Sequence, residues 1–240
     1  MDRFVYTASP SRIVFGPDSI DQLPAEIERL GAQRALVLCT PNQRDQAQAI
    51  ADRLPGRVAW IFDEAAMHVP IETARKARAL ALELKADCAL AVGGGSTVGL
   101  GKAIALESGL PIIAVPTTYA GSEATPIYGI TEGGLKKTGR DPRVLPRVVI
   151  YDPKLTLSLP LDLTVTSAIN AMAHAAEGLY AHDGNPVISL MAEEGIRACA
   201  ASLRPLRENP RDLPARSLAL YGAWLCGTVL GAVSMGLHHK

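Results

Sequence analysis

The chain has 240 residues, of which 48% are hydrophobic, enough for one large domain or two ordinary ones with a sizeable core. Its formal net charge is zero, which argues against nucleic acid or an anionic membrane surface as a partner. No apolar leader opens the sequence, and the four scattered cysteines indicate reduced, buried thiols in a cytoplasmic protein rather than a disulfide framework.

The first half of the sequence alternates short apolar runs of strand type with helical stretches. Strands are predicted at residues 12–15, 34–39, 58–62, 88–92, 111–115 and 148–151, and helices at 45–54, 71–85 and 97–108. Strands that are apolar along their whole length and separated by helices are typical of a parallel sheet covered on both faces. Before the last strand, residues 131–147 form a polar, glycine-rich excursion.

After Asp152-Pro153 the strand signals vanish. Three helices are predicted, at residues 163–180, at 187–203 and from 215 to at least 237, with proline and glycine between them. The sequence therefore predicts an α/β domain over residues 1–157 and an all-helical domain over residues 158–240. The chain stops after Lys240 without a helix stop signal, so we expect the helical domain to be truncated.

Residues 217–237 contain only neutral side chains, and this length is close to that of a membrane span. Four glycines interrupt the segment, and no other part of the sequence supports a membrane protein. A buried central helix of a helical domain is the favoured interpretation.

The phrase GGGSTVGLGKA, residues 93–103, directly follows the strand predicted at 88–92. Its spacing lacks the G-x-x-x-x-G-K-[ST] of a kinase-type phosphate loop, and Val98 stands where G-x-G-x-x-G needs its third glycine. Three glycines at a strand end still let a ligand approach the backbone, and Ser96-Thr97 begin a helix whose free N–H groups attract phosphate. A tight turn without a ligand is the alternative, and the residue types favour a phosphate site.

The phrase PTTYAGSEATP, residues 116–126, occupies the equivalent place after the next strand. Hydroxyl groups at strand ends are usually caps, so Thr117 and Thr118 alone are weak evidence. Open parallel sheets bind ligands at the carboxyl ends of their strands, however, and two such turns together favour a nucleotide crevice.

The order of these motifs resembles one family, the iron-containing or group III alcohol dehydrogenases, and within it most closely the maleylacetate reductase branch. The resemblance rests on GGGSTVGLGKA, PTTYAGSEATP, SAINAMAHAAEGLYA (residues 167–181) and SMGLHHK (residues 234–240), and it covers the whole chain. It implies a Rossmann-like α/β domain that binds NADH or NADPH, followed by a helical substrate and metal domain.

The resemblance also implies which residues bind the cofactor. Lys136, next to Lys137, would reach the ribose; the other positions would hold the pyrophosphate or lie along the cofactor, and they are Gly93, Gly94, Gly95, Ser96, Thr97, Thr117 and Thr118. The family usually has an acidic residue after the second strand, where this chain has Cys39-Thr40-Pro41. Without that carboxylate, NADPH should be tolerated as well as NADH. The family's Asp after the glycine loop is Gly99 here, another departure.

Metal-dependent members begin their metal site with an Asp and a His one helical turn apart. Here the pair is Asn170 and His174, and His239 would be the third ligand. A neutral amide is a poor ligand for Fe or Zn compared with a carboxylate, so we expect a weak site that need not be filled. The alternatives are a hydrogen-bonded cleft histidine for His174 and a polar helix end for His239.

The implied reaction is the NAD(P)H-dependent reduction of maleylacetate to 3-oxoadipate in aromatic-compound degradation. Its substrate is a small dicarboxylate with a polarised alkene, which depends less on a Lewis acid than a ketone does. His174 and His239 could donate protons or bind carboxylates. Tyr119 is a third catalytic candidate, or else a half-buried loop aromatic. Glu177 is interpreted as a solvated charge and only a slight site candidate.

Two alternatives remain open. One is a metal-dependent alcohol or polyol dehydrogenase of the same superfamily. The other is a nucleotide-binding fragment without catalysis, in view of the abrupt C-terminus. In either case we expect a homodimer in the cytoplasm.

Overall fold

A computed structural model describes residues 4–8, 11–234 and 236 of the chain. The described residues form two compact units. The sheet unit comprises Ser11–Thr117 and Pro126–Asp152, and the helical unit comprises the described parts of Met1–Pro10, Thr118–Thr125 and Pro153–Lys240. The short segment Thr118–Thr125 thus folds with the helices, although sheet residues precede and follow it in the sequence.

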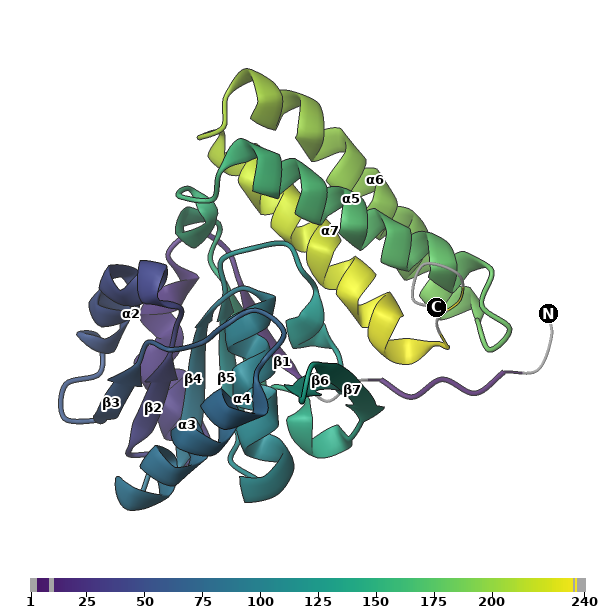
Figure 1. The fold of residues 1–240 in the computed structure, drawn as a ribbon. Helices are drawn as coiled ribbons and strands as arrows, with labels where there is room; N and C mark the ends of the chain where they lie inside the picture. Colours follow the sequence, from purple (N-terminus) through teal and green to yellow (C-terminus); the bar gives the residue numbers. More distant parts are fainter. Residues whose placement is uncertain (1–3, 9–10, 235, 237–240) are drawn as a thin grey trace. The chain divides into compact units, whose positions relative to one another are not determined.

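The sheet unit contains six parallel strands in the order β1-β8-β5-β4-β2-β3 (Figure 1). Their bounds are β1 Arg12–Phe15, β2 Ala35–Leu38, β3 Val58–Phe62, β4 Cys88–Gly93, β5 Ile112–Pro116 and β8 Val148–Tyr151. The helices of this unit are α1 Leu23–Arg29, α2 Arg44–Ala51, α3 Ile71–Glu83 and α4 Gly95–Ser108. The predicted parallel sheet followed by helices is confirmed, whereas α1 was not predicted.

The central strands are buried along their whole length. Every residue of β2, β4, β5 and β8 is buried, as expected for a parallel sheet that is covered on both faces. Alternate residues of β2 face opposite sides of the sheet. Leu36 and Leu38 pack in one cluster with buried residues of α3 and α4, so Val37 points to the opposite face. The four cysteines are free and buried, which confirms their prediction as reduced thiols.

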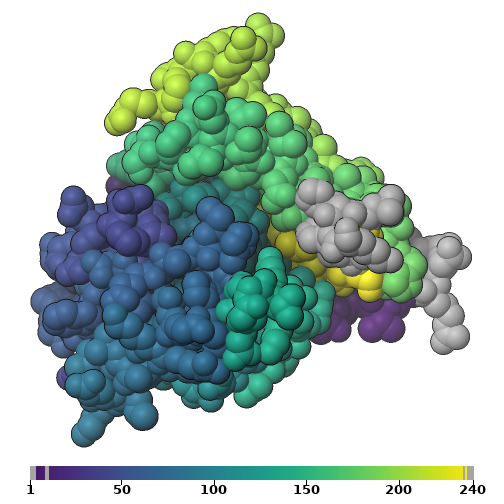
Figure 2. All heavy atoms as spheres, viewed as in Figure 1, coloured from purple at the N-terminus to yellow at the C-terminus, as the bar shows by residue number. Residues whose placement is uncertain are grey.

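The polar excursion before β8 contains a hairpin that the sequence did not predict. Strands β6 (Ile127–Glu132) and β7 (Leu135–Arg140) pair antiparallel around Gly133 and Gly134. None of the twelve residues of these two strands is buried, so no apolar alternation marked them as strands. The hairpin lies at the surface of the sheet unit (Figure 2).

The helical unit is built on three long helices that pack against one another (Figure 1): α5 Leu161–Leu179, α6 Pro186–Glu208 and α7 Leu213–Ala232. Side chains cap two of them, because Asn185 accepts from the first N–H groups of α6 and Asp212 accepts from Ala215 of α7. Small residues let α6 and α7 approach closely. A Cβ on Gly222 would lie 2.6 Å from the sulfur of Cys199.

The prediction that the last helix continues to residue 237 is wrong, because α7 ends at Ala232. The backbone N–H of Ser234 donates to the Asp183 carboxylate at 2.9 Å, and its hydroxyl donates to the same group, so this N–H is not available to extend the helix. Within the described ranges, none of the helices combines the length and the hydropathy of a membrane span.

The buried sheet makes a first prediction. Leu90 stands in the middle of β4 and is fully buried, so Leu90→Ala should lower the free energy of unfolding by about 2–5 kcal/mol. The control is Leu82→Ala on α3, where the side chain is 82% exposed and the expected change is within about 0.5 kcal/mol. Urea unfolding followed by circular dichroism measures both, and equal effects would contradict the buried position of β4.

Candidate functional site

The glycine loop begins at a backbone position that only glycine tolerates. Gly93 ends β4 with φ at 150°, and a Cβ there would lie 2.5 Å from the Thr97 hydroxyl and 2.7 Å from Oε1 of Gln43. Both neighbours already occupy the space, so any side chain would push them away. The absence of a side chain at Gly93 therefore lets Thr97 and Gln43 lie close to the backbone at the end of β4.

The start of α4 supplies groups that fit a phosphate. The helix begins at Gly95, so the N–H groups of its first turn lie at the carboxyl end of β4. The Thr97 hydroxyl is fully buried, and no described group hydrogen-bonds to it. A buried polar atom without a partner is costly, and a phosphate oxygen at the helix start would satisfy it. Gly93, Gly94, Gly95, Ser96 and Thr97 thus fit the dinucleotide that the sequence predicts.

Gln43 joins the glycine loop to the next turn, and no pattern in the sequence predicted it as a site residue. Its side-chain amide donates to the Thr117 hydroxyl at 2.8 Å, and the N–H of Thr117 donates to the carbonyl of Gly93 at 3.1 Å. The hydroxyl of Thr40 donates to Oε1 of Gln43 at 3.1 Å. The ends of β2, β4 and β5 are therefore tied together by side-chain and backbone hydrogen bonds. The contact of Thr117 with a cofactor stays a prediction.

Gly99, where the family has an Asp, faces Val69. A Cβ on Gly99 would lie 2.7 Å from Cγ2 of Val69, which is buried and adopts a positive φ of 49°. Positive φ is strained for a β-branched residue. The segment that carries Val69 is held by a backbone bond from Thr131 to the Val69 carbonyl, at 3.0 Å. Val69 therefore takes the space that a longer side chain at position 99 would need.

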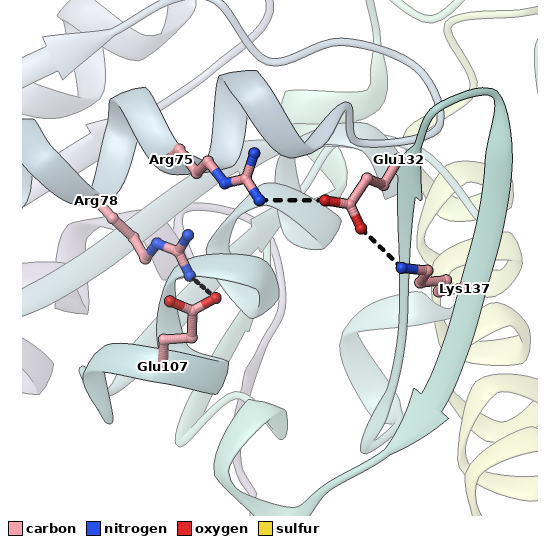
Figure 3. Close-up of polar contacts among 5 residues, drawn as sticks. All are labelled: Arg75, Arg78, Glu107, Glu132 and Lys137. Carbon is pink, nitrogen blue, oxygen red and sulfur yellow. Dashed lines mark hydrogen bonds and ion pairs between the residues drawn. The ribbon is translucent and has the colours of Figure 1, made fainter.

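The two lysines of β7 have different surroundings. Lys137 donates to Glu132 at 2.7 Å, and Glu132 also accepts from Arg75 of α3 at 3.1 Å (Figure 3). The hydrogen bond from Lys137 is the main reason why the pKa of Glu132 is lowered. Lys136 is exposed and pairs with Thr131 across the hairpin, and its Cε lies 2.9 Å from where a Cβ on Gly129 would be. Of the two, Lys136 is the one that no described carboxylate pairs with, and its contact with a ribose stays a prediction.

Tyr119 is fully buried within the helical unit rather than half-buried in a loop. Its hydroxyl accepts from Nη1 of Arg216 at 3.2 Å and donates to the Thr156 hydroxyl at 3.2 Å. Thr156 donates in turn to the carbonyl of Pro153. A catalytic role for Tyr119 stays a prediction, and the contacts show that it supports the helical unit.

Arg216 is the largest fully buried side chain of the described chain. Besides Tyr119, it donates to the Thr164 hydroxyl and to the carbonyls of Pro210 and Leu159, at 2.9 to 3.2 Å. No carboxylate of the described residues pairs with it. Hydrogen bonds to hydroxyl and carbonyl oxygens therefore offset the free-energy cost of burying this charge.

The segment Thr118–Thr125 is fixed to α7 by a backbone contact. Gly121 has a φ of 78°, and a Cβ on it would lie 3.1 Å from the Cα of Gly227. Thr118, predicted to lie along the cofactor, is the first residue of this segment and belongs to the helical unit. Its contact with a cofactor stays a prediction.

Asn170 and His174 meet on α5, as their spacing predicts. The side-chain nitrogen of Asn170 lies 3.3 Å from Nε2 of His174, and His174 is buried. Glu177, one turn further on, is also buried, with 2% of its surface exposed, and accepts from the hydroxyl of Tyr180 at 3.4 Å. The interpretation of Glu177 as a solvated charge is therefore wrong: it sits on the same helix face as His174. His239 lies outside the described residues.

The described part of this helix face does not by itself fit a divalent metal. Within residues 4–8, 11–234 and 236, no three His, Cys, Asp or Glu side chains come together as a metal site would require. Asn170 and His174 offer one amide and one imidazole, and neither of these ligands brings the negative charge that favours a 2+ ion. The predicted set of Asn170, His174 and His239 is brought together only in its first two members.

Two successive parts of the chain match families of iron-containing alcohol dehydrogenases. Residues 10–153 match the family described as "Iron-containing alcohol dehydrogenase", and residues 164–240 match "Fe-containing alcohol dehydrogenase family, C-terminal". The first match contains the glycine loop, and the second contains the Asn170–His174 pair.

Individual relatives are similar over the same length. The maleylacetate reductase of Burkholderia cepacia is 65% identical over 240 residues, and that of Pseudomonas knackmussii is 57% identical over 237 residues. The chain spans 68% and 67% of these two proteins. The crystal structure of maleylacetate reductase from Rhizobium sp. strain MTP-10005 is 57% identical, with a TM-score of 0.97 over 100% of this chain and 68% of that one.

The glycine loop makes a second prediction. Gly93→Ala should weaken NADH binding at least about tenfold, because the new methyl group displaces Thr97 and Gln43 and strains the backbone. Gly109→Ala is the matched control: its φ is also positive, at 71°, but nothing lies within 4 Å of the added methyl group. Titration of NADH fluorescence measures both variants. Equal affinity in the two would mean that the space at Gly93 has no part in binding.

A third prediction concerns the buried Arg216. Tyr119→Phe removes the hydroxyl that accepts from this cation, so the free energy of unfolding should fall by about 1–3 kcal/mol. In the control Tyr6→Phe, the lost hydroxyl belongs to an exposed side chain, and the change should stay within about 0.5 kcal/mol. Thermal unfolding compares them. A Tyr119→Phe variant of unchanged stability that cannot turn over would instead support the catalytic role.

Proposed function

Because the chain belongs to the iron-containing alcohol dehydrogenase family, we propose that it reduces maleylacetate to 3-oxoadipate with NADH or NADPH. The observation that carries the proposal is the identity, along the whole chain, with the maleylacetate reductases described above. That identity spans both the glycine loop of the sheet unit and the Asn170–His174 helix of the helical unit. The product belongs to the breakdown of aromatic compounds.

The enzyme is an NAD(P)-dependent oxidoreductase, and its cofactor residues lie mainly in the sheet unit. The residues from Gly93 to Thr97 would hold the pyrophosphate through backbone N–H groups and the Thr97 hydroxyl. Gln43 holds Thr117 in place beside this turn. Thr118 and Lys136 would complete the set, at the nicotinamide and ribose parts. The reduced nicotinamide supplies the hydride.

The proposed substrate has an alkene conjugated to a ketone and two carboxylates. Hydride adds to the alkene carbon that is β to the ketone. The alkene electrons then move toward the ketone oxygen, and an enolate results. A proton at the neighbouring carbon then completes the reduction. The protein must therefore orient the alkene, stabilise the enolate and bind two carboxylates.

His174 is the described side chain best suited to hold or move that proton. An imidazole titrates near neutral pH, so it can donate a proton or bind a carboxylate as imidazolium. Asn170 lies within hydrogen-bonding distance of Nε2 and can orient the ring. We assign His174 the proton-donor or carboxylate-binding role, and His239 a second such role. Tyr119, which is buried against Arg216, is assigned a supporting role first.

We further propose that catalysis does not require a metal. Asn170 stands where metal-dependent members have a carboxylate, and a neutral amide removes one of the negative charges that hold a 2+ ion. An alkene already polarised by a ketone has less need of a Lewis acid than an isolated carbonyl group. A homodimer in the cytoplasm, with a small dicarboxylate as substrate, completes the proposal.

The fourth prediction tests the reaction and the metal together. NADH oxidation should be seen with maleylacetate, and dialysis against a chelator should leave the rate within about twofold. His174→Gln keeps a polar side chain but cannot carry the proton, so kcat should fall by about 10²–10⁴. Absorbance at the NADH band follows the rate, and metal content is measured on the same samples.

Asn170→Asp asks whether the amide is what weakens the metal site. A carboxylate beside His174 should raise the affinity for Zn²⁺, whereas Asn209→Asp, at an exposed position after α6, should not. Loss of turnover on chelation, restored by Fe²⁺ or Zn²⁺, would contradict the metal-free proposal. Oxidation of a simple alcohol in the presence of metal, without reduction of maleylacetate, would support a metal-dependent alcohol dehydrogenase. Nucleotide binding without any turnover would indicate a non-catalytic fragment.

A further inference from the structure

An arginine and a carboxylate meet where the next two strands beyond the glycine loop end. Arg44 is the first residue of α2, after the turn that follows β2, and Asp63 directly follows β3. Nη1 of Arg44 donates to Oδ2 of Asp63 at 2.9 Å. Both side chains are about 40% exposed, at 42% and 38%. Neither residue belongs to the motifs from which the cofactor site was predicted.

The strand order places this pair on one side of the phosphate loop. In the sheet, β4 is followed by β2 and then by β3, and Leu38 of β2 is in register with both Ala91 and Phe62. Gly93 and Asp63 therefore end at the same edge, roughly 10 Å apart at the usual strand spacing. In open parallel sheets, the adenosine half of a dinucleotide extends from the glycine loop over the end of the neighbouring strand, where a carboxylate binds the 2′-hydroxyl or an arginine the 2′-phosphate.

The pair also lies close to the end of β2 itself. The pKa of the Cys39 thiol is raised to about 11, first by burial and then by the negative charge of Asp63, while the positive charge of Arg44 lowers it. Both charges therefore act on Cys39, which directly follows β2 and precedes Thr40. Thr40 contacts Gln43, and Gln43 contacts the Thr117 hydroxyl beside the glycine loop. Hydrogen bonds therefore connect Thr117, beside the glycine loop, to Gln43 and Thr40, and Arg44 directly follows Gln43 in the sequence.

We propose that Arg44 binds the 2′-phosphate of NADPH and that Asp63 tunes the choice between NADPH and NADH. The inference rests on the proposed NAD(P) cofactor and goes beyond it by naming the residues that decide between the two. Arginine has five N–H donors, and the contacts of the described residues use one of those on Arg44, so the fork can still take a phosphate.

Asp63 explains how one site can accept both cofactors. With NADH, the pair remains closed, and the carboxylate is within reach of a ribose hydroxyl. With NADPH, the phosphate competes with Asp63 for the same guanidinium, and the remaining carboxylate repels it. The chain lacks the acidic residue after β2 that would exclude NADPH. Asp63, after β3, instead lowers the affinity for NADPH moderately.

The fifth prediction compares binding of adenosine 2′,5′-bisphosphate and ADP by isothermal titration calorimetry, which does not depend on turnover. Arg44→Gln should weaken the bisphosphate by about 10- to 100-fold and ADP by less than about threefold, since a charge-assisted bond to phosphate is lost. Asp63→Asn should strengthen the bisphosphate by about fivefold. Steady-state kinetics should move in parallel, with the KM for NADPH rising in Arg44→Gln and kcat unchanged.

The matched controls are Arg53→Gln and Asp21→Asn, which remove another ion pair of the sheet unit. Arg53 is 40% exposed and lies 3.2 Å from Asp21, so its surroundings resemble those of Arg44. Neither control should alter the ratio of the two affinities. An unchanged ratio in Arg44→Gln, or an equal loss of both ligands, would overturn the inference. Failure of maleylacetate turnover with a shifted binding ratio would overturn the proposed reaction and leave the inference standing.

Discussion

The site depends on one constraint: a parallel sheet that is buried on both faces can offer only its strand ends to a ligand. All six residues of β4 are buried, so nothing along the strand is free for chemistry until Gly93. At that residue the backbone takes a φ of 150° and the chain turns directly into α4. The first polar groups that a ligand meets are therefore the start of a helix and the hydroxyl of Thr97. Gln43 and Thr117, from the ends of the flanking strands, close the arrangement by hydrogen bonds rather than by packing.

The helical unit depends on a different constraint: the buried charge of Arg216 must be satisfied by hydrogen bonds. Arg216 is fully buried, and the oxygens that surround it come from hydroxyls and carbonyls of Tyr119, Thr164, Leu159 and Pro210. Each of these bonds is needed, because losing one leaves part of the guanidinium unsatisfied. This explains why a tyrosine from a loop phrase between two strands folds with the helices. The same phrase approaches α7 at Gly121 and Gly227, where two glycines allow backbone contact.

The two proposals turn on charge. At Asn170 the resemblance implies a carboxylate in metal-dependent members, and we propose that the neutral amide next to His174 leaves the imidazole able to act as an acid or a base without a metal. At the far strands of the sheet, no acidic residue stands at Cys39-Thr40-Pro41 after β2, whereas Asp63, after β3, pairs with Arg44. In both places the proposal rests on a difference of one charge, which would change the ion or phosphate that the site holds.

The sequence by itself determined the parallel sheet, the helices that follow it, the glycine loop and the Asn170–His174 pair. Periodicity and local spacing carry that information, since apolar strands, glycines at a strand end and an i, i+4 pair are local patterns. The β6–β7 hairpin was not predicted because its residues are not buried. The end of α7 was placed too late because Asp183, from a distant turn, accepts a hydrogen bond from the N–H of Ser234. Only the tertiary structure decided that Gln43 borders the loop, that Tyr119 and Glu177 are buried, and that Arg44 meets Asp63. Those contacts join residues far apart in sequence, and no local pattern records which distant groups a fold brings together.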